Sequence, residues 1–198
     1  MINEAEPSIF RTELARVLPR DRDAWLDQRW RLAEIPDDDP ELPRGCVPYL
    51  PCPVATVLAA LDAAEVTSRD VFVDIGSGAG RTVLLARLLS GATCLGLEIQ
   101  PTLVAAARKS ADALGLDRTE FIAGDAADAL RLVAHGSVFF LYCPFGGERL
   151  ERLLDDLQVV AGAHPIRICC VQMPPLVRPW LERLPSATVE LDVYRSTR

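Results

Sequence analysis

An acidic residue and three glycines at alternate positions stand in the segment FVDIGSGAG, residues 72–80. The acid is Asp74, and the glycines are Gly76, Gly78 and Gly80. Glycine has no Cβ, so it reaches positive φ at low cost and lets a ligand approach the backbone closely. A strand-to-helix turn without a ligand is the alternative interpretation, but such a turn does not need so many glycines. The segment therefore predicts a nucleotide-type binding site.

The spacing of these glycines distinguishes between two classes of nucleotide site. Dinucleotide-binding folds carry GxGxxG, whose third glycine allows close helix packing below a pyrophosphate. This chain has GxGxG, and Arg81 stands where that third glycine would be. The carboxylate of Asp74 would also repel a pyrophosphate and attract an ammonium group. A cationic nucleoside-type ligand is favoured, and an NAD(P)-dependent oxidoreductase is the less favoured alternative.

Further candidate residues follow the next buried runs of the sequence. Each also has a structural explanation, because Glu98 could cap the next helix, Asp125 could be a helix N-cap and Phe145 could be core. All of them are expected at the carboxyl ends of strands, facing one crevice. The candidates are Glu98 and Ile99 after the second run, Gly124, Asp125 and Ala126 after the third, and Tyr142, Cys143, Pro144 and Phe145 after the fourth.

The elements that must position these residues alternate regularly from residue 53 onward. The apolar runs lack polar alternation, as expected for central parallel strands covered on both faces. This pattern predicts an α/β fold with a doubly wound sheet whose ligand lies at the carboxyl ends of the strands. The expected helices are 53–66, 80–90, 101–114, 126–134, 147–161 and 176–184, and the expected strands are 71–75, 93–98, 119–123, 137–143, 166–172 and 188–195.

On these motifs the chain resembles the class I S-adenosylmethionine-dependent methyltransferases over residues 53–195. The resemblance implies a doubly wound, mostly parallel Rossmann-like sheet and S-adenosyl-L-methionine as cofactor. It implies that Asp74 favours the methionine end of the cofactor, Glu98 binds the ribose hydroxyls and Asp125 takes the adenine amino group. The implied cofactor-binding residues are Asp74, Gly76, Ser77, Gly78, Gly80, Glu98, Ile99, Asp125 and Ala126, and the implied catalytic wall beside the methyl group is Tyr142, Cys143, Pro144 and Phe145.

Within this class the chain is most similar to bacterial methyltransferases related to the Dot1-like histone-lysine group. The shared features are the DxGSGxGR run and an aromatic-x-Pro-Phe end to the fourth strand. Because the chain is acidic, histone methylation is not carried across with the fold. Cys143 stands where amino-methylating relatives carry Asn or Asp, and a thiol is a poor hydrogen-bond acceptor, which disfavours nitrogen methylation.

No general base is evident in the motifs. The nearest candidates are Tyr49, Tyr142 and Glu148. A non-catalytic S-adenosylmethionine-binding protein is therefore a further alternative.

Composition limits the partners that we expect. A net charge of -7 and a pI near 4.9 argue against the broad basic surface of a nucleic-acid-binding protein. We expect a small-molecule or protein acceptor, no nucleic acid, no membrane anchor and a cytoplasmic location, and the oligomeric state is open. The six cysteines include no CxxC pair, so we expect buried thiols and no metal site.

Two units are expected along the chain. Residues 1–52 form a helical N-terminal extension and linker, with Trp25 and Trp30 in its second helix, and residues 53–198 form the methyltransferase domain. The proline-rich and acidic stretch 36–43 is expected to be an exposed linker. The extension is a lid candidate through Tyr49, and we expect it to build the acceptor side of the cleft; simple docking of the indoles on the sheet's flank is the alternative.

The glycine loop should open where the strand order reverses. The strand 71–75 is therefore expected between the strands 93–98 and 137–143. The last run, 188–195, is expected to close the edge of the sheet as a single strand, without the two-stranded hairpin that relatives usually have.

Overall fold

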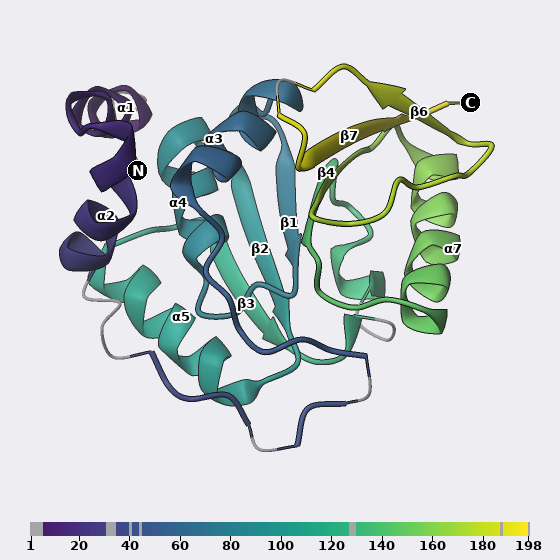
Figure 1. Ribbon diagram of the computed structural model, residues 1–198, viewed down its shortest axis with the longest axis horizontal. Helices are drawn as coiled ribbons and strands as arrows, with labels where there is room; N and C mark the ends of the chain where they lie inside the picture. The colour runs from purple at the N-terminus through teal and green to yellow at the C-terminus, as the bar shows by residue number, and fades with distance from the viewer. Residues whose placement is uncertain are drawn as a thin grey trace.

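The computed structural model describes residues 6–30, 35–39, 41–43, 45–126, 130–186 and 188–197. It contains one seven-stranded sheet with the strand order β3-β2-β1-β4-β5-β7-β6, covered by helices (Figure 1). The expected doubly wound, mostly parallel sheet is confirmed. The strands are β1 (Val71–Ile75), β2 (Thr93–Glu98), β3 (Thr119–Ala123), β4 (Val138–Tyr142), β5 (Arg167–Val171), β6 (Leu181–Leu184) and β7 (Leu191–Ser196).

Strand β1 lies between β2 and β4 and is parallel to both. Its register pairs Asp74 with Gly96 on β2 and with Phe140 on β4. The expected order around the glycine loop is confirmed. The chain turns from one side of β1 to the other at this point, so the carboxyl end of β1 is the switch point at which doubly wound sheets bind ligands.

Glycine and proline residues mark the ends of two helices that follow strands. Helix α4 starts directly after Gly80, which has a φ of 84°, and it ends at Gly91, which has a φ of 73°. Helix α5 begins with Pro101, a residue suited to the first helical turn. The helices are α1 (Glu6–Arg16), α2 (Arg22–Trp30), α3 (Val54–Ala63), α4 (Arg81–Ser90), α5 (Pro101–Ala113) and α7 (Glu148–Ala163), with the 3₁₀ helices η1 (Pro19–Asp21) and η3 (Leu130–Val133).

Side chains alternate between two cores, one on each face of the sheet. Phe72 of β1 packs in the core beneath α3, α4 and α5, whereas Val73 packs in the core beneath α7. Successive residues of a strand point to opposite faces, so both neighbours are apolar when both faces are covered. This explains why the central strands read as continuous apolar runs.

The helix expected at 126–134 is only partly comparable with the structure. Residues 127–129 lie outside the described residues, and Leu130–Val133 form η3, a short 3₁₀ helix.

The C-terminal part of the chain corrects two expectations. Residues 176–184 are not a helix, because Pro174, Pro175 and Pro179 surround its first half and the chain continues as strand β6. Strand β7 is not the edge: it pairs antiparallel with both β5 and β6, so β6 is the outer strand of a hairpin. Two cross-strand ion pairs support this hairpin: Glu182 with Arg195, and Arg183 with Asp192. The helical spacing of the sequence did not reveal these pairs.

The first two helices pack against the sheet domain. Phe10 stacks on Trp30, and both are buried in the same core cluster as α4. Arg81 at the start of α4 is almost fully buried and forms ion pairs with Asp23 at 2.6 Å and Asp27 at 2.5 Å, both on α2. These contacts agree with a docking role for the second helix and its indoles.

The stretch 36–43 is not the solvent-exposed linker that its prolines and charges suggested. Its described residues are mostly half-buried, and the backbone N–H of Asp39 donates to Gln100 Oε1 at 2.7 Å. In Figure 1 this stretch runs across the ends of the strands where the candidate site lies. Charged residues in this stretch therefore make long-range hydrogen bonds that a charge pattern cannot reveal.

Candidate active site

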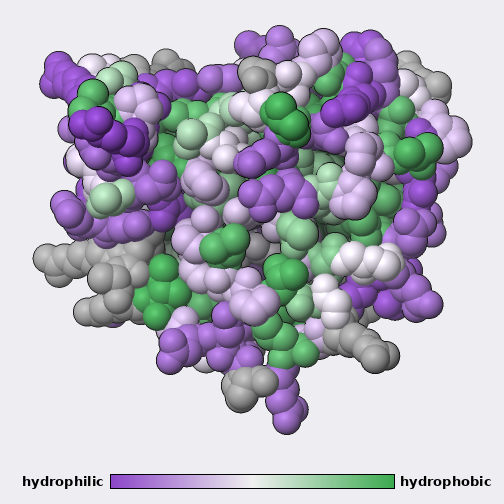
Figure 2. Space-filling view, in the orientation of Figure 1, coloured by the Kyte–Doolittle hydropathy of each residue, from purple (hydrophilic) through white to green (hydrophobic). Residues whose placement is uncertain are grey.

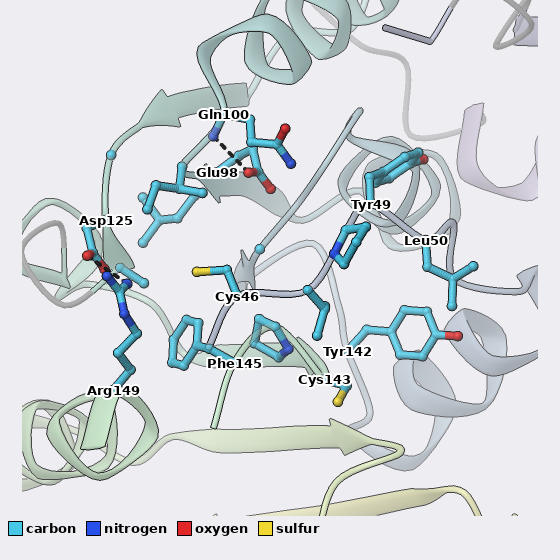
Figure 3. Close-up of a pocket in the computed structure, with 18 of the residues that line it drawn as sticks. Cys46, Tyr49, Leu50, Glu98, Gln100, Asp125, Tyr142, Cys143, Phe145 and Arg149 are labelled. Carbon is cyan, nitrogen blue, oxygen red and sulfur yellow. Dashed lines mark hydrogen bonds and ion pairs between the residues drawn. The ribbon is translucent and has the colours of Figure 1, made fainter. Parts of the chain in front are cut away.

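A cavity of about 340 Å³ opens at the carboxyl ends of β1, β2 and β4. Residues 45–52, here called the roof segment, cover one side of it, and Cys46 of this segment forms a β-bridge with Phe145. Figure 3 shows Glu98 and Asp125 toward one end of the cavity and Leu50 and Tyr142 toward the other, with Cys46 between them. The cavity therefore has a polar end and an apolar end.

Nine of the thirteen predicted site residues line this cavity. They are Gly76, Glu98, Ile99, Asp125, Ala126, Tyr142, Cys143, Pro144 and Phe145. Phe145 is also part of the core beneath α7, so its structural interpretation holds as well. Four predicted residues are not among those that line it: Asp74, Ser77, Gly78 and Gly80.

Two of the glycines are required by close packing within the protein. A Cβ on Gly76 would lie 2.8 Å from Pro144 Cβ, so the glycine loop and the end of β4 interlock. A Cβ on Gly80 would lie 2.7 Å from the ring of Phe121 and 2.9 Å from Ala107 Cβ. All three distances are shorter than a carbon contact allows, so these positions accept only glycine without a shift.

Gly78 is covered by an aromatic ring of the roof segment. A Cβ at Gly78 would lie 2.1 Å from Tyr49 Cδ2, and Gly78 has a φ of 52°. Burial raises the pKa of Tyr49 to about 12, and its hydroxyl has no hydrogen-bond partner among the described residues. A buried phenol of this kind is neutral at physiological pH, so Tyr49 is unsuited to the role of general base.

Asp74 is buried on β1 below this ring. Burial raises its pKa well above the ordinary value for a carboxyl group, and the charge of nearby Glu98 raises it further. An ammonium group placed beside it would oppose both effects. Asp74 is thus an acid whose ionised form needs a cationic partner.

Glu98 ends β2 and is held by two backbone donors. Gly78 N–H donates to its Oε2 at 2.8 Å, and Gln100 N–H donates to its Oε1 at 2.9 Å. The second bond lies at the start of α5, so the capping interpretation of Glu98 is part of its role. Each carboxylate oxygen keeps a further lone pair, which can accept a hydrogen bond from a ligand hydroxyl.

Asp125 follows β3 and forms an ion pair with Arg149 of α7 at 2.7 Å (Figure 3). The thiol of Cys46 points into the cavity between Glu98 and this pair (Figure 3), and burial raises its pKa. Both carboxylates therefore stand at the polar end of the cavity, where Arg149 balances one of them.

The opposite end of the cavity is apolar and has unusual backbone geometry. Leu50 is 62% exposed there, and Figure 2 shows hydrophobic groups on the same face as the stretch 36–52. Cys143 and Gln172 directly follow the paired ends of β4 and β5, and both have left-handed φ values, 42° and 53°. Non-glycine residues in this conformation cost about 1 to 3 kcal/mol and concentrate at functional sites.

The proposed bases are not poised for proton abstraction. Burial raises the pKa of Tyr142, as it does for Tyr49. Glu148 is exposed at the start of α7 and is not among the cavity-lining residues.

Sequence reasoning missed several residues of the cavity wall. Gln100 and Arg149 each stand at the beginning of a helix that follows a candidate strand end, which is a positional signal that could have drawn attention to them. No motif pointed to Cys46, Val47 or Gln172, because their positions depend on how the roof segment and β5 fold onto the site.

The residues present fit a nucleoside with a cationic tail. The cavity volume lies at the lower end of the range of small-molecule sites, about 300 to 1,000 Å³. Glu98 offers free lone pairs, Ile99 offers an apolar surface, and the orphaned hydroxyl of Tyr49 lies close to Asp74 and Arg81. S-adenosylmethionine has the matching groups: ribose hydroxyls, an adenine ring and an ammonium-bearing tail.

Comparison with known proteins agrees with this fit. Residues 67–138 match the family described as methyltransferase domain. An RNA methyltransferase from Salinibacter ruber, solved in complex with S-adenosyl-L-homocysteine, is 29% identical, with a TM-score of 0.55; the match covers 74% of this chain and 92% of that one. A search of curated proteins found no match.

Two more distant structures share the fold alone. A mutant of MtNAS in complex with S-adenosylmethionine is 19% identical over 71% of this chain and 61% of its own, with a TM-score of 0.55. TrmN from Thermus thermophilus is 20% identical over 70% of this chain and 47% of its own, with a TM-score of 0.50.

The fold is that of the class I S-adenosylmethionine-dependent methyltransferases. The matched family and the structures solved with S-adenosylhomocysteine or S-adenosylmethionine support S-adenosylmethionine as the cofactor, as the motifs predicted. Among the residues that the structure describes, no helix has the length and apolar character needed to cross a membrane.

Proposed function

We propose that this protein transfers a methyl group from S-adenosylmethionine to a small-molecule or protein acceptor. One observation carries the proposal: a single cavity is lined by Gly76, Glu98 and Asp125, which follow or end β1, β2 and β3, and by the segment 142–145 at the end of β4. The end of β4 thus lies where an acceptor can meet a cofactor held by the ends of β1, β2 and β3.

Each group has a defined task in this proposal. When bound, S-adenosylmethionine supplies an electrophilic methyl group on a sulfonium. Glu98 holds ribose hydroxyls, Ile99 packs on the adenine and Asp125 accepts from its amino group. Asp74 stabilises the ammonium end, and Tyr142, Cys143, Pro144 and Phe145 form the wall that excludes water and orients the acceptor. Most of the acceleration comes from this positioning.

The apolar end of the cavity supports an acceptor with an uncharged surface next to its nucleophile. Leu50 and Tyr142 lie at this end (Figure 3), and neither of them carries a charge at neutral pH. Cys143 offers no strong acceptor for an amine. These features favour a small molecule, or an uncharged nucleophilic side chain of a protein, over a lysine ammonium. Histone-type activity is not part of the proposal.

RNA is a second candidate acceptor, because the Salinibacter ruber neighbour is an RNA methyltransferase. The net charge of -7 opposes attraction to a phosphate backbone, which depends on clustered Lys and Arg. The small-molecule or protein acceptor is therefore preferred.

Transfer of a radiolabelled methyl group from S-adenosylmethionine tests the proposal. The protein is incubated with three pools from bacterial cells: small metabolites, proteins and total RNA. We expect label in the metabolite or protein pool, and less label with a Glu98→Ala variant at a limiting cofactor concentration. Label in the RNA pool alone would replace the acceptor assignment, and binding of S-adenosylhomocysteine without transfer to any pool would indicate a non-catalytic binding protein.

A further inference from the structure

Asp38, in the stretch between α2 and the roof segment, links two parts of the cofactor site. Its Oδ1 atom accepts a hydrogen bond from the backbone N–H of Tyr49 at 2.9 Å and another from Gln100 Nε2 at 2.8 Å. Tyr49 belongs to the roof segment and Gln100 stands at the start of α5. One carboxylate oxygen thus joins the roof segment to the start of α5.

The side chain of Gln100 is buried, and both ends of its amide are used in this link. Its Nε2 donates to Asp38, and its Oε1 accepts from the backbone N–H of Asp39 at 2.7 Å. A buried amide with donor and acceptor both bonded has one defined orientation. Gln100 is therefore a fixed anchor for the two aspartates.

The link closes a ring of contacts around the glycine loop. The backbone N–H of Gln100 donates to Glu98, and Glu98 accepts from the N–H of Gly78 at 2.8 Å. The ring of Tyr49 returns to Gly78 and covers it. The position of Tyr49 over the loop is thus tied, through Asp38 and Gln100, to the carboxylate that faces the ribose position.

We propose that Asp38 and Gln100 are positioning residues for the cofactor, which act by holding Tyr49 over Gly78 and by orienting Glu98. This inference rests on the proposed function, because it presumes that the cavity binds S-adenosylmethionine. Neither the GxGxG motif nor the strand-end acids point to Asp38. Its role follows from two hydrogen bonds that cross 11 and 62 residues of the chain.

The test measures S-adenosylhomocysteine affinity by calorimetry on the full chain, together with the thermal unfolding of the free protein. The variants are Asp38→Ala and Gln100→Ala. Asp37→Ala is the matched control, because Asp37 is the exposed neighbour and its loss changes the net charge equally. We expect Kd to rise about tenfold for each variant and to stay unchanged for the control, since each variant removes two hydrogen bonds at the site.

Two further variants separate positioning from a general structural effect. Asp38→Asn keeps the acceptor oxygen, so its Kd should stay within about threefold of wild type. Gln100→Glu places a carboxylate oxygen opposite Asp38 and should weaken binding more than Gln100→Ala.

The outcomes are distinct for the two proposals. Wild-type protein that fails to bind S-adenosylhomocysteine would overturn the proposed function itself. Wild-type protein that binds, with Asp38→Ala binding equally well, would overturn the positioning role alone. The role would also be overturned if affinity fell only in step with the unfolding temperature and Asp38→Asn bound no better than Asp38→Ala.

Discussion

The aromatic ring of Tyr49 lies directly on Gly78, so closely that a Cβ at position 78 would be 2.1 Å from Tyr49 Cδ2 and 2.2 Å from Cε2. The second glycine of the GxGxG motif is thus required by a contact inside the protein, in addition to any contact with a ligand. The roof segment and the glycine loop can meet only because one of them lacks a side chain at this point.

Gly78→Ala should therefore displace Tyr49 and weaken S-adenosylhomocysteine binding by more than tenfold, as measured by calorimetry. Left-handed strain alone costs about 1 to 2 kcal/mol, and the clash adds to it. Gly115→Ala is the matched control, since Gly115 has a φ of 63° and nothing lies within 4 Å of an added Cβ. Equal loss of stability in the two variants, with unchanged affinity in Gly78→Ala, would show that the contact between Tyr49 and Gly78 is not needed for ligand binding.

Glu98→Ala should reduce ligand affinity by about 1 to 3 kcal/mol, because charge-assisted hydrogen bonds to the ligand are lost and the N–H groups of Gly78 and Gln100 lose their acceptor. Titration calorimetry measures the affinity. Glu120→Ala, an exposed acid on the neighbouring strand β3, should leave it unchanged. Unchanged affinity in a folded Glu98→Ala variant would make this acid purely structural.

Replacing both Asp23 and Asp27 by Ala should lower the free energy of unfolding by about 2 to 4 kcal/mol in a denaturant titration. The side chain of Arg81 is 4% exposed and would keep its charge without these partners. Asp62→Ala, which removes the exposed partner of Arg11, should change stability by less than about 0.5 kcal/mol. Equal effects of the two changes would show that α2 is not anchored through Arg81.

Asp74 should make ligand binding depend on pH. The pKa of Asp74 is higher in the folded protein than in the unfolded chain. The folded protein therefore loses stability as pH rises from the pKa of the unfolded state to that of the folded state. An ammonium group beside it favours the ionised form, so S-adenosylhomocysteine affinity should increase with pH over that window and binding should release a proton.

Asp74→Asn tests this directly. The variant should be more stable than wild type at neutral pH, with the difference vanishing in acid, and its affinity should be weaker and independent of pH. Calorimetry in buffers of different ionisation enthalpy counts the proton. A wild-type affinity that does not change with pH would show that Asp74 does not interact with the charged end of the cofactor.

The parallel part of the fold could be predicted from the sequence because its signals are local. Apolar runs such as 71–75 and 138–142 are buried on both faces, and the glycine turn after the first of them marks the switch point. The strand ends then placed Glu98, Asp125 and Phe145 at one edge of the sheet, and the cavity brings them together.

What could not be predicted depends on contacts between distant segments. The hairpin of β6 and β7 is stabilised by cross-strand pairs such as Glu182 with Arg195, which local helical spacing does not reveal. The acidic stretch 36–43 looked solvated because its charges give no sign of their partners, yet Asp38 bonds to Gln100 far along the chain. Likewise, no sequence pattern indicates that Tyr49 lies on Gly78.

Titration calorimetry of the full chain with S-adenosylmethionine, S-adenosylhomocysteine and NAD tests the central claim most directly. The GxGxG turn, Asp74 and the free lone pairs of Glu98 suit a nucleoside with an amino-acid tail, so we expect saturable heat with S-adenosylmethionine and S-adenosylhomocysteine and none with NAD. Saturable heat with NAD and none with S-adenosylhomocysteine would contradict the account.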